Sequence, residues 1–197
     1  MKKLLYSNLF FFMLLSVSVF VVYTKSLSFG FVNYDDDTLI VNNISYISDI
    51  KNIPKFFTES CFYDKASAFY RPVLTLSFVF EAVFFGTNPK IYHLTNIVLF
   101  ILSVYLIYVF LSKIELNRNI LKTLCLLTAV HPIFTSSVVW IPARNDVLLM
   151  IFFCLSIINL INYFNLRKSY YFVFACLFFA VALFTKETAL ILSLIYF

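Results

Sequence analysis

The sequence predicts an all-α, polytopic membrane helix bundle of about five complete spans followed by a truncated sixth. Hydrophobic residues make up 62% of the 197 residues, mean hydropathy is +0.92, and only 13% of residues are charged. Such a composition excludes an ordinary soluble domain. The chain also holds 26 Phe but only two Gly, whereas a β-barrel needs many turn residues and alternating hydrophobicity.

Residues 4–23 form the first apolar run, directly after Lys2 and Lys3. A run of this length matches the ~20 residues that a helix needs to cross a bilayer. The alternative is a cleaved signal peptide, but the run is long for a signal core and no small-x-small cleavage motif follows before Lys25. We therefore expect a first span over residues 1–25, with its N-terminus in the cytoplasm.

Residues 26–90 form a long polar segment, which we expect to be an external loop carrying short interfacial helices. Residues 50–57 predict one such amphipathic helix, interrupted by Pro54. Residues 73–85 are apolar, but as a helix they reach only about 20 Å at ~1.5 Å per residue, too short to span. They predict a second interfacial helix, ended by the turn residues 86–89.

Residues 91–197 carry the remaining predicted spans. Apolar runs cover residues 91–111, 120–140, 147–164 and 170–184, and residues 189–197 begin the sixth span. We expect His131-Pro132 to kink or cap the third span, because proline lacks a backbone N–H. Polar islands at residues 142–146 and 185–188 separate the later spans.

The charges support this layout. On the predicted cytoplasmic side lie seven basic residues and one acid, Glu115, against eight basic residues and nine acids on the other side. The positive-inside rule requires short, basic cytoplasmic loops. The basic loops therefore need no nucleic-acid partner, and the polar islands all fall on the external face.

Three consecutive carboxylates, Asp35, Asp36 and Asp37, form the candidate catalytic cluster. Like charges this close repel and are partly desolvated near a bilayer, so at least one pKa should be raised. A carboxylate in that setting can act as a base or bind a cation, and a divalent metal is compatible with it. The alternative is a solvated, Asp-rich turn.

The polar islands supply further candidates. Arginine matches a phosphate through its bidentate fork and lysine supplies a point charge, which favours Arg144 and Lys186 as anion ligands. Each candidate also has a structural alternative: Lys186 and Glu187 could pair at a helix end, Arg144 could anchor to lipid headgroups, and Asp146 could cap the fourth span. His131 could cap the third span. Their common placement on one face favours a shared site.

Five motifs in order carry a resemblance to a known family: FVNYDD…IVNN, YRPVLTLSF, NPKIYHLTNIVL, HPIFTSSVVWIPARNDVL and FTKETAL. From about Phe29 onward the chain resembles the GT-C membrane glycosyltransferases, in the branch of the transmembrane-and-tetratricopeptide O-mannosyltransferases and their bacterial relatives. Full-length members of that family have more spans and often soluble repeats. We therefore expect residues 1–197 to form the N-terminal part of one GT-C-like transmembrane domain, as a fragment or a truncated product.

The resemblance implies transfer of a sugar, such as mannose, from a polyprenyl-phosphate-linked donor to a hydroxyl of a protein or glycolipid acceptor. The reaction would take place at the external or luminal face of the bilayer. By the same resemblance Asp35 and Asp36 form the catalytic pair, with Asp37 an extra acid. The remaining assignments are donor phosphate binding by Arg71, Arg144 and Lys186, and shaping of the site by His131, Asp146 and Glu187.

Two other classes of function use the same residues. A transporter or flippase for a lipid-linked or anionic substrate would line its path with them, although the charges lie mainly at span ends rather than mid-membrane. A non-catalytic assembly subunit is the other alternative. The Lys-, Asn-, Ile- and Phe-rich usage favours a bacterial inner membrane over the endoplasmic reticulum.

Overall fold

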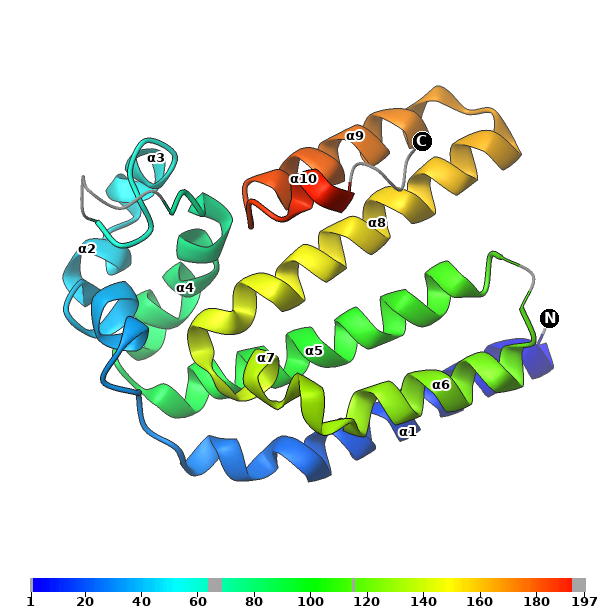
Figure 1. The fold of residues 1–197 in the computed structure, drawn as a ribbon, viewed down its shortest axis with the longest axis horizontal. Helices are drawn as coiled ribbons and strands as arrows, with labels where there is room; N and C mark the ends of the chain where they lie inside the picture. Colours follow the sequence, from blue (N-terminus) through cyan, green and yellow to red (C-terminus); the bar gives the residue numbers. More distant parts are fainter. Residues whose placement is uncertain (1, 64–68, 115, 193–197) are drawn as a thin grey trace.

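The computed structural model describes residues 2–63, 69–114 and 116–192, with side chains described from residue 8 onward. Among these residues there are helices and no strands, as the sequence predicts. Long helices lie side by side, and a group of short helices caps one end of the bundle (Figure 1). The α-helices are α1 (Lys2–Tyr23), α2 (Ile44–Ser48), α3 (Ile53–Phe56), α4 (Pro72–Phe85), α5 (Pro89–Leu111), α6 (Arg118–Val130), α7 (Thr135–Val139), α8 (Arg144–Leu166), α9 (Ser169–Leu183) and α10 (Ala189–Leu192).

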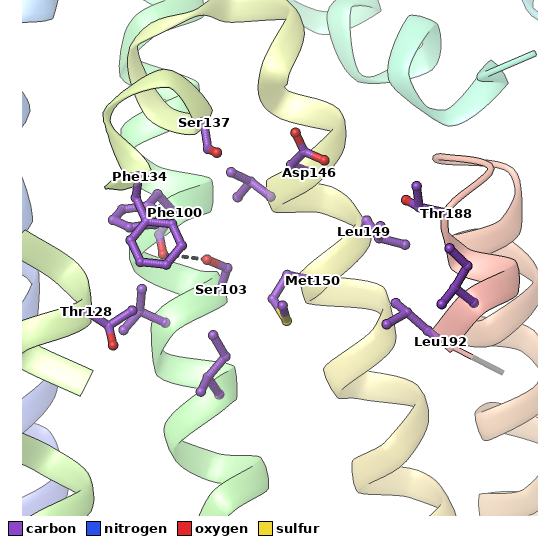
Figure 2. A pocket seen from close by; sticks show the side chains of 14 residues that line it. Phe100, Ser103, Thr128, Phe134, Ser137, Asp146, Leu149, Met150, Thr188 and Leu192 are labelled. Atoms are coloured by element: carbon purple, nitrogen blue, oxygen red, sulfur yellow. Dashed lines mark hydrogen bonds between the residues drawn. The ribbon is translucent and has the colours of Figure 1, made fainter. Parts of the chain in front are cut away.

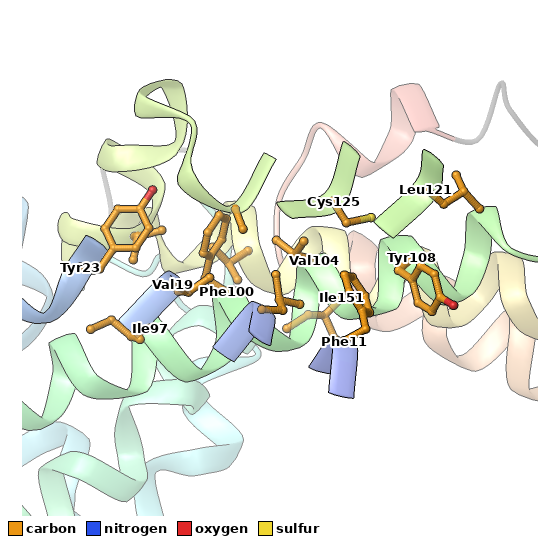
Figure 3. Close-up of a cluster of buried hydrophobic side chains, with 14 residues drawn as sticks. Phe11, Val19, Tyr23, Ile97, Phe100, Val104, Tyr108, Leu121, Cys125 and Ile151 are labelled. Carbon is orange, nitrogen blue, oxygen red and sulfur yellow. The ribbon is translucent and has the colours of Figure 1, made fainter. Parts of the chain in front are cut away.

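The main core joins α1, α5, α6 and α8 (Figure 3). Helix α1 contributes a stripe of side chains four residues apart, which is the spacing that keeps residues on one helix face. These are Phe11, Leu15, Val19 and Tyr23, each at most 3% exposed. Helices α5 and α6 contribute the residues that pack against this stripe, namely Ile97, Phe100, Val104, Tyr108, Leu121, Cys125 and Ala129. The opposite faces of these helices remain apolar and exposed, as expected for surfaces that meet lipid.

A second core holds the short helices at the end of the bundle. Leu74, Phe78 and Ala82 form the buried stripe of α4 and pack against Ile40, Ile47 and Tyr92, among other residues. Helix α4 confirms the predicted short apolar helix. The other predicted interfacial helix is a 3₁₀ turn (Ile50–Asn52) followed by α3. Pro54 lies in the first turn of α3 rather than interrupting it, because no N–H is needed there.

The protein is an integral membrane protein, but it has fewer candidate spans than the sequence predicted. Three helical segments are long and apolar enough to cross a bilayer, namely Asn8–Ser28, Pro89–Leu111 and Ile141–Leu166. The predicted third span is a pair of helices, Arg118–Val130 and Pro132–Val139, that bend by 52°. The bend occurs where Pro132 cannot donate the helical hydrogen bond. If the bent pair is one span, the total is four.

The predicted fifth span is also shorter than a span requires. Helix α9 has 15 residues, about 22 Å at ~1.5 Å per residue, against a hydrocarbon core of roughly 30 Å. It ends at Leu183 because the polar residues 185–188 follow. Of the predicted sixth span, only the start is described, as α10, and residues 193–197 lie outside the described part of the chain.

The loops divide between the two ends of the bundle as the charges predicted. The short connections between α5 and α6 and between α8 and α9 lie at the same end as the N-terminus, whereas α2, α3, α4 and the turn after α9 lie at the other (Figure 1). Polar segments far apart in sequence therefore meet at one end. Glu115, Asp64 and Lys65, which entered the charge comparison, lie outside the described residues.

Candidate functional site

A polar pocket of about 110 Å³ lies at the end of the bundle that carries the short helices. Four of the predicted site residues line it: Asp35, Arg71, Asp146 and Lys186. They come from the loop after α1, the start of α4, the first turn of α8 and the segment after α9. The structure thus brings together residues up to about 150 positions apart in sequence.

Arg71 and Glu187 form the first ion pair at this pocket. Arg71 Nε lies 3.2 Å from both carboxylate oxygens of Glu187, and Arg71 Nη2 lies 3.0 Å from Oε2. Desolvation is the largest single influence on the pKa of Glu187 and acts to raise it, but the hydrogen bonds and positive charge of Arg71, a backbone hydrogen bond and the charge of Lys186 together lower the pKa. Next to this pair, the N–H of Val73 donates to the C=O of Phe184 at 3.2 Å. The start of α4 is thereby tied to the end of α9.

Lys186 and Asp146 form the second ion pair, between the segment after α9 and the first turn of α8. The Lys186 side chain is 22% exposed and the Asp146 side chain is 44% exposed, so solvent reaches both groups. Asp146 does not cap α8 but lies within its first turn. A guanidinium has five N–H donors and an ammonium three, so both cations can pair with a carboxylate and still bind a further anion.

The acid triplet divides between two environments. Asp35 is partly buried and lines the pocket. Burial raises its pKa, and the positive charge of Arg71 opposes that shift. Asp36 is only 1% exposed and does not line the pocket; its Oδ2 accepts the N–H of Val32 at 2.8 Å.

Burial also raises the pKa of Asp36. The Val32 N–H opposes this shift, and the charges of Asp35 and Asp37 add to it. The sequence predicted a raised pKa in this triplet from charge repulsion together with partial desolvation. In the folded protein both act on Asp36, and desolvation is the larger.

Arg144 is not among the pocket residues. It is fully buried, and its Nη2 lies 2.7 Å from Glu81 Oε1, whose side chain is 1% exposed. Its Nε donates to Asn96 Oδ1 at 2.7 Å, and its Nη1 and Nη2 donate to the C=O groups of Ser77 and Tyr92. Arg144 therefore links α4, α5 and α8 in the protein interior and does not line the polar pocket.

His131 also lies outside the pocket, exposed at the bend between α6 and α7. Its Nδ1 accepts the N–H of Ile133 at 3.2 Å and so caps the 3₁₀ turn Pro132–Phe134, which lies within the predicted third span rather than at an end of it. Among the lining residues with a nitrogen, oxygen or sulfur atom in the side chain, sequence reasoning missed three, namely Cys61, Trp140 and Asn145. Burial raises the pKa of Cys61 to about 11, so its thiol is protonated at neutral pH. Trp140 carried a signal, as the single tryptophan beside a polar island.

An apolar groove of about 400 Å³ adjoins the polar pocket. It runs between α5, α6 and α8 and is closed on one side by α10 (Figure 2). Asp146 lines both the groove and the polar pocket, so the two spaces meet at this carboxylate. Ser137 and Asp146 lie at one end of the groove, with Met150 and Leu192 further along.

No group of three or more His, Cys, Asp or Glu side chains within residues 2–63, 69–114 and 116–192 is arranged to hold a metal ion. Asp35 and Asp146 are the acids that line the pocket, and Asp146 is paired with Lys186.

Comparison with known proteins identifies relatives. The human protein O-mannosyl-transferase TMTC1 is 34% identical over 144 residues, 70% of this chain, and human TMTC2 is 31% identical over 151 residues, 74% of the chain. Tmtc1 of Drosophila melanogaster is 26% identical over 179 residues, 89% of the chain. No family model matches, and no solved structure matches.

The chain spans only 16%, 18% and 21% of the lengths of these three relatives. All three are animal proteins, so they do not support the preference for a bacterial inner membrane. They do confirm the resemblance read from the five sequence motifs. Over most of its length, this chain is a homologue of the TMTC protein O-mannosyl-transferases.

Proposed function

We propose that this protein contributes the donor and catalytic site of a membrane glycosyltransferase. The enzyme transfers a sugar from a polyprenyl-phosphate carrier to a hydroxyl of a protein or glycolipid. The names of its relatives indicate that this sugar is mannose. One observation carries the proposal: Asp35, Arg71, Asp146 and Lys186 line one polar pocket that adjoins an apolar groove. A lipid-linked sugar needs both parts, a polar site for its head and an apolar one for its chain.

In this reaction Asp35 is the general base. Its carboxylate takes the proton of the acceptor hydroxyl while the hydroxyl oxygen bonds to the anomeric carbon. The bond between that carbon and the phosphate oxygen breaks, and polyprenyl phosphate leaves with the electron pair. Arg71 and Lys186 stabilise the negative charge that develops on the leaving phosphate. We assign Asp36 and Arg144 to positioning rather than to contact with the substrate, because both are buried away from the pocket.

The proposal is tested by turnover. The full-length protein, reconstituted in lipid vesicles, is given labelled polyprenyl-phosphate-mannose and a serine- or threonine-containing peptide, and the peptide is analysed for label. A transport assay on the same vesicles follows the lipid between leaflets. Label on the peptide without lipid movement is the expected result. Lipid movement without transfer would instead establish the transporter alternative.

The location of the charges favours the transferase over the transporter. Within the candidate spans Asn8–Ser28, Pro89–Leu111 and Ile141–Leu166, the described charged residues are Lys25, Lys90, Arg144 and Asp146. Each lies within a turn or two of a span end, whereas a translocation path requires ionisable groups near mid-membrane. A non-catalytic assembly subunit predicts that replacing the carboxylates alters complex formation but leaves transfer unchanged.

We expect the apolar groove to hold the polyprenyl chain. Met150→Trp would fill the groove and should raise the KM for the polyprenyl-linked donor by about 10-fold with little change in kcat, since overpacking an apolar site costs roughly 1–3 kcal/mol. Steady-state kinetics measure this effect. The matched control is Leu102→Trp, because Met150 and Leu102 are 38% and 40% exposed and Leu102 does not line the groove. Equal effects of the two variants would contradict this role.

A further inference from the structure

We infer that Trp140 and Asn145 form the subsite that recognises the sugar ring of the donor, beside the charged residues that act on its phosphate. This inference rests on the proposed function and assigns recognition of the sugar to one side of the polar pocket. Both residues line the pocket. Neither was among the candidates that the sequence offered.

Asn145 provides the first observation. It is 5% exposed, and its side-chain oxygen has no hydrogen-bond partner among the described residues. A buried acceptor without a partner costs stability, because it has lost its bonds to water and gained none. Such a group is accounted for by a donor from outside the chain, either an ordered water or a ligand. In a pocket, a ligand hydroxyl is a donor of the right kind.

Trp140 provides the second observation. It precedes the Ile141–Ala143 turn that leads into α8 and lines the same pocket as Asn145. An indole presents a large apolar face together with one N–H donor. The C–H face of a pyranose can pack on such a ring while its hydroxyls bond at their edges to amide and carboxylate oxygens.

A buried polar network holds the backbone at Trp140 in position and includes Arg144, the residue before Asn145. The side-chain amide of Asn96 donates to the C=O groups of Val138, Trp140 and Ile141 at 3.2–3.4 Å. The other side of the same amide accepts Arg144 Nε at 2.7 Å. The backbone leading into the turn and the Arg144 side chain that follows it are therefore both bonded to α5. Locking a site by such supporting bonds is what precise ligand recognition requires.

The pocket is charged and large enough to admit a small polar ligand. Its volume of about 110 Å³ has room for several water molecules, at about 10–15 Å³ for each. The cations Arg71 and Lys186 and the base Asp35 line the same pocket. A sugar ring held by Trp140 and Asn145 would therefore have its phosphate beside the cations and its anomeric carbon near the base.

The tryptophan itself reports on occupancy, because Trp140 is the only tryptophan in this chain. The protein in lipid nanodiscs is titrated with polyprenyl phosphate and, separately, with polyprenyl-phosphate-mannose, and tryptophan fluorescence is recorded. The Trp140→Phe variant supplies the background signal. We expect a larger fluorescence change with the sugar-bearing lipid than with the sugar-free one. Equal changes, or no change with either lipid, would overturn the subsite.

The Asn145→Leu variant tests the hydrogen bond. Affinity for polyprenyl-phosphate-mannose should fall by about 10-fold, the effect of one lost hydrogen bond, while affinity for polyprenyl phosphate stays unchanged. Thermal stability of the empty protein should stay equal or rise, since an unpartnered acceptor has been removed. A purely structural asparagine would give a lower stability and an equal loss for both lipids, and that result would overturn the assignment.

Asn159→Leu is the matched control on the same helix. Asn159 donates its amide to the C=O of Leu155 at 2.8 Å and does not line the pocket, so the ratio of the two lipid affinities should not change. The experiments distinguish a failure of the sugar subsite from a failure of the proposed enzymatic function. Sugar transfer to a peptide combined with equal binding of both lipids overturns only the subsite, whereas preferential binding of the sugar-bearing lipid without any transfer overturns only the enzymatic proposal.

Discussion

Asp35→Asn should lower sugar transfer by at least about 100-fold, the low end of the contribution of a positioned general base. The amide has nearly the shape of the carboxylate but cannot take the acceptor's proton. Asp35 is the member of the acid triplet that lines the pocket, so the loss should fall on kcat and leave donor binding in place. Transfer of labelled mannose to a peptide by the full-length protein measures the first quantity, and lipid binding the second.

The two neighbouring acids serve as controls for this variant. Asp37→Asn should retain near-normal transfer. Asp36→Asn keeps an oxygen to accept the N–H of Val32 and removes a charge whose burial is unfavourable, so its effect should be much smaller than that of Asp35→Asn. Loss of transfer in Asp36→Asn alone would make Asp36 the base. Unchanged turnover in both variants would exclude the pair from catalysis.

The pH dependence follows from the same carboxyl. Burial raises the pKa of Asp35 above its ordinary value of 3.8, and only the deprotonated form can act as a base. Transfer by the wild-type protein should therefore decline on acidification at a pH above that expected for a free aspartate. The residual transfer of Asp35→Asn should lack this decline.

Arg144→Met should destabilise the protein by about 3–5 kcal/mol, the usual cost of leaving one member of a buried ion pair without the other. Glu81 would then be a charge 1% exposed to solvent, and Ser77, Tyr92 and Asn96 would lose their shared donor. The guanidinium also lies 4.6 Å from the centre of the Phe78 ring. Unfolding in detergent, followed by circular dichroism against temperature and denaturant, measures this loss.

Two further variants show whether the burial of the pair is the cause. Arg144→Met combined with Glu81→Leu should recover much of the lost stability, because an apolar pair of similar volume leaves no charge unpaired. Arg71→Met is the matched arginine control. Its partner Glu187 is 46% exposed, so the cost should stay below about 1 kcal/mol. Equal losses for Arg144→Met and Arg71→Met would contradict the interpretation.

The composition and spacing of the sequence predicted much of the fold. Apolar runs located the segments of α1, α5 and α8, and the 13 residues from Val73 to Phe85 were recognised as too short to span. The count of spans was wrong for two reasons. Pro132 divides one apolar run into a bent pair, and the polar residues after Leu183 end another run early.

The sequence alone determined that the polar islands belong to one end of the membrane, because the distribution of lysine and arginine fixes which loops share a side. It could not determine which of those residues meet. Whether Arg144 faces the pocket or Glu81 depends on the rotation of α8 against α4 and α5. Whether Asp35 or Asp36 lines the pocket depends on the orientation in which the helical turn that contains both residues packs against the second core. These choices are made by packing between segments distant in sequence, so only the tertiary structure decided them.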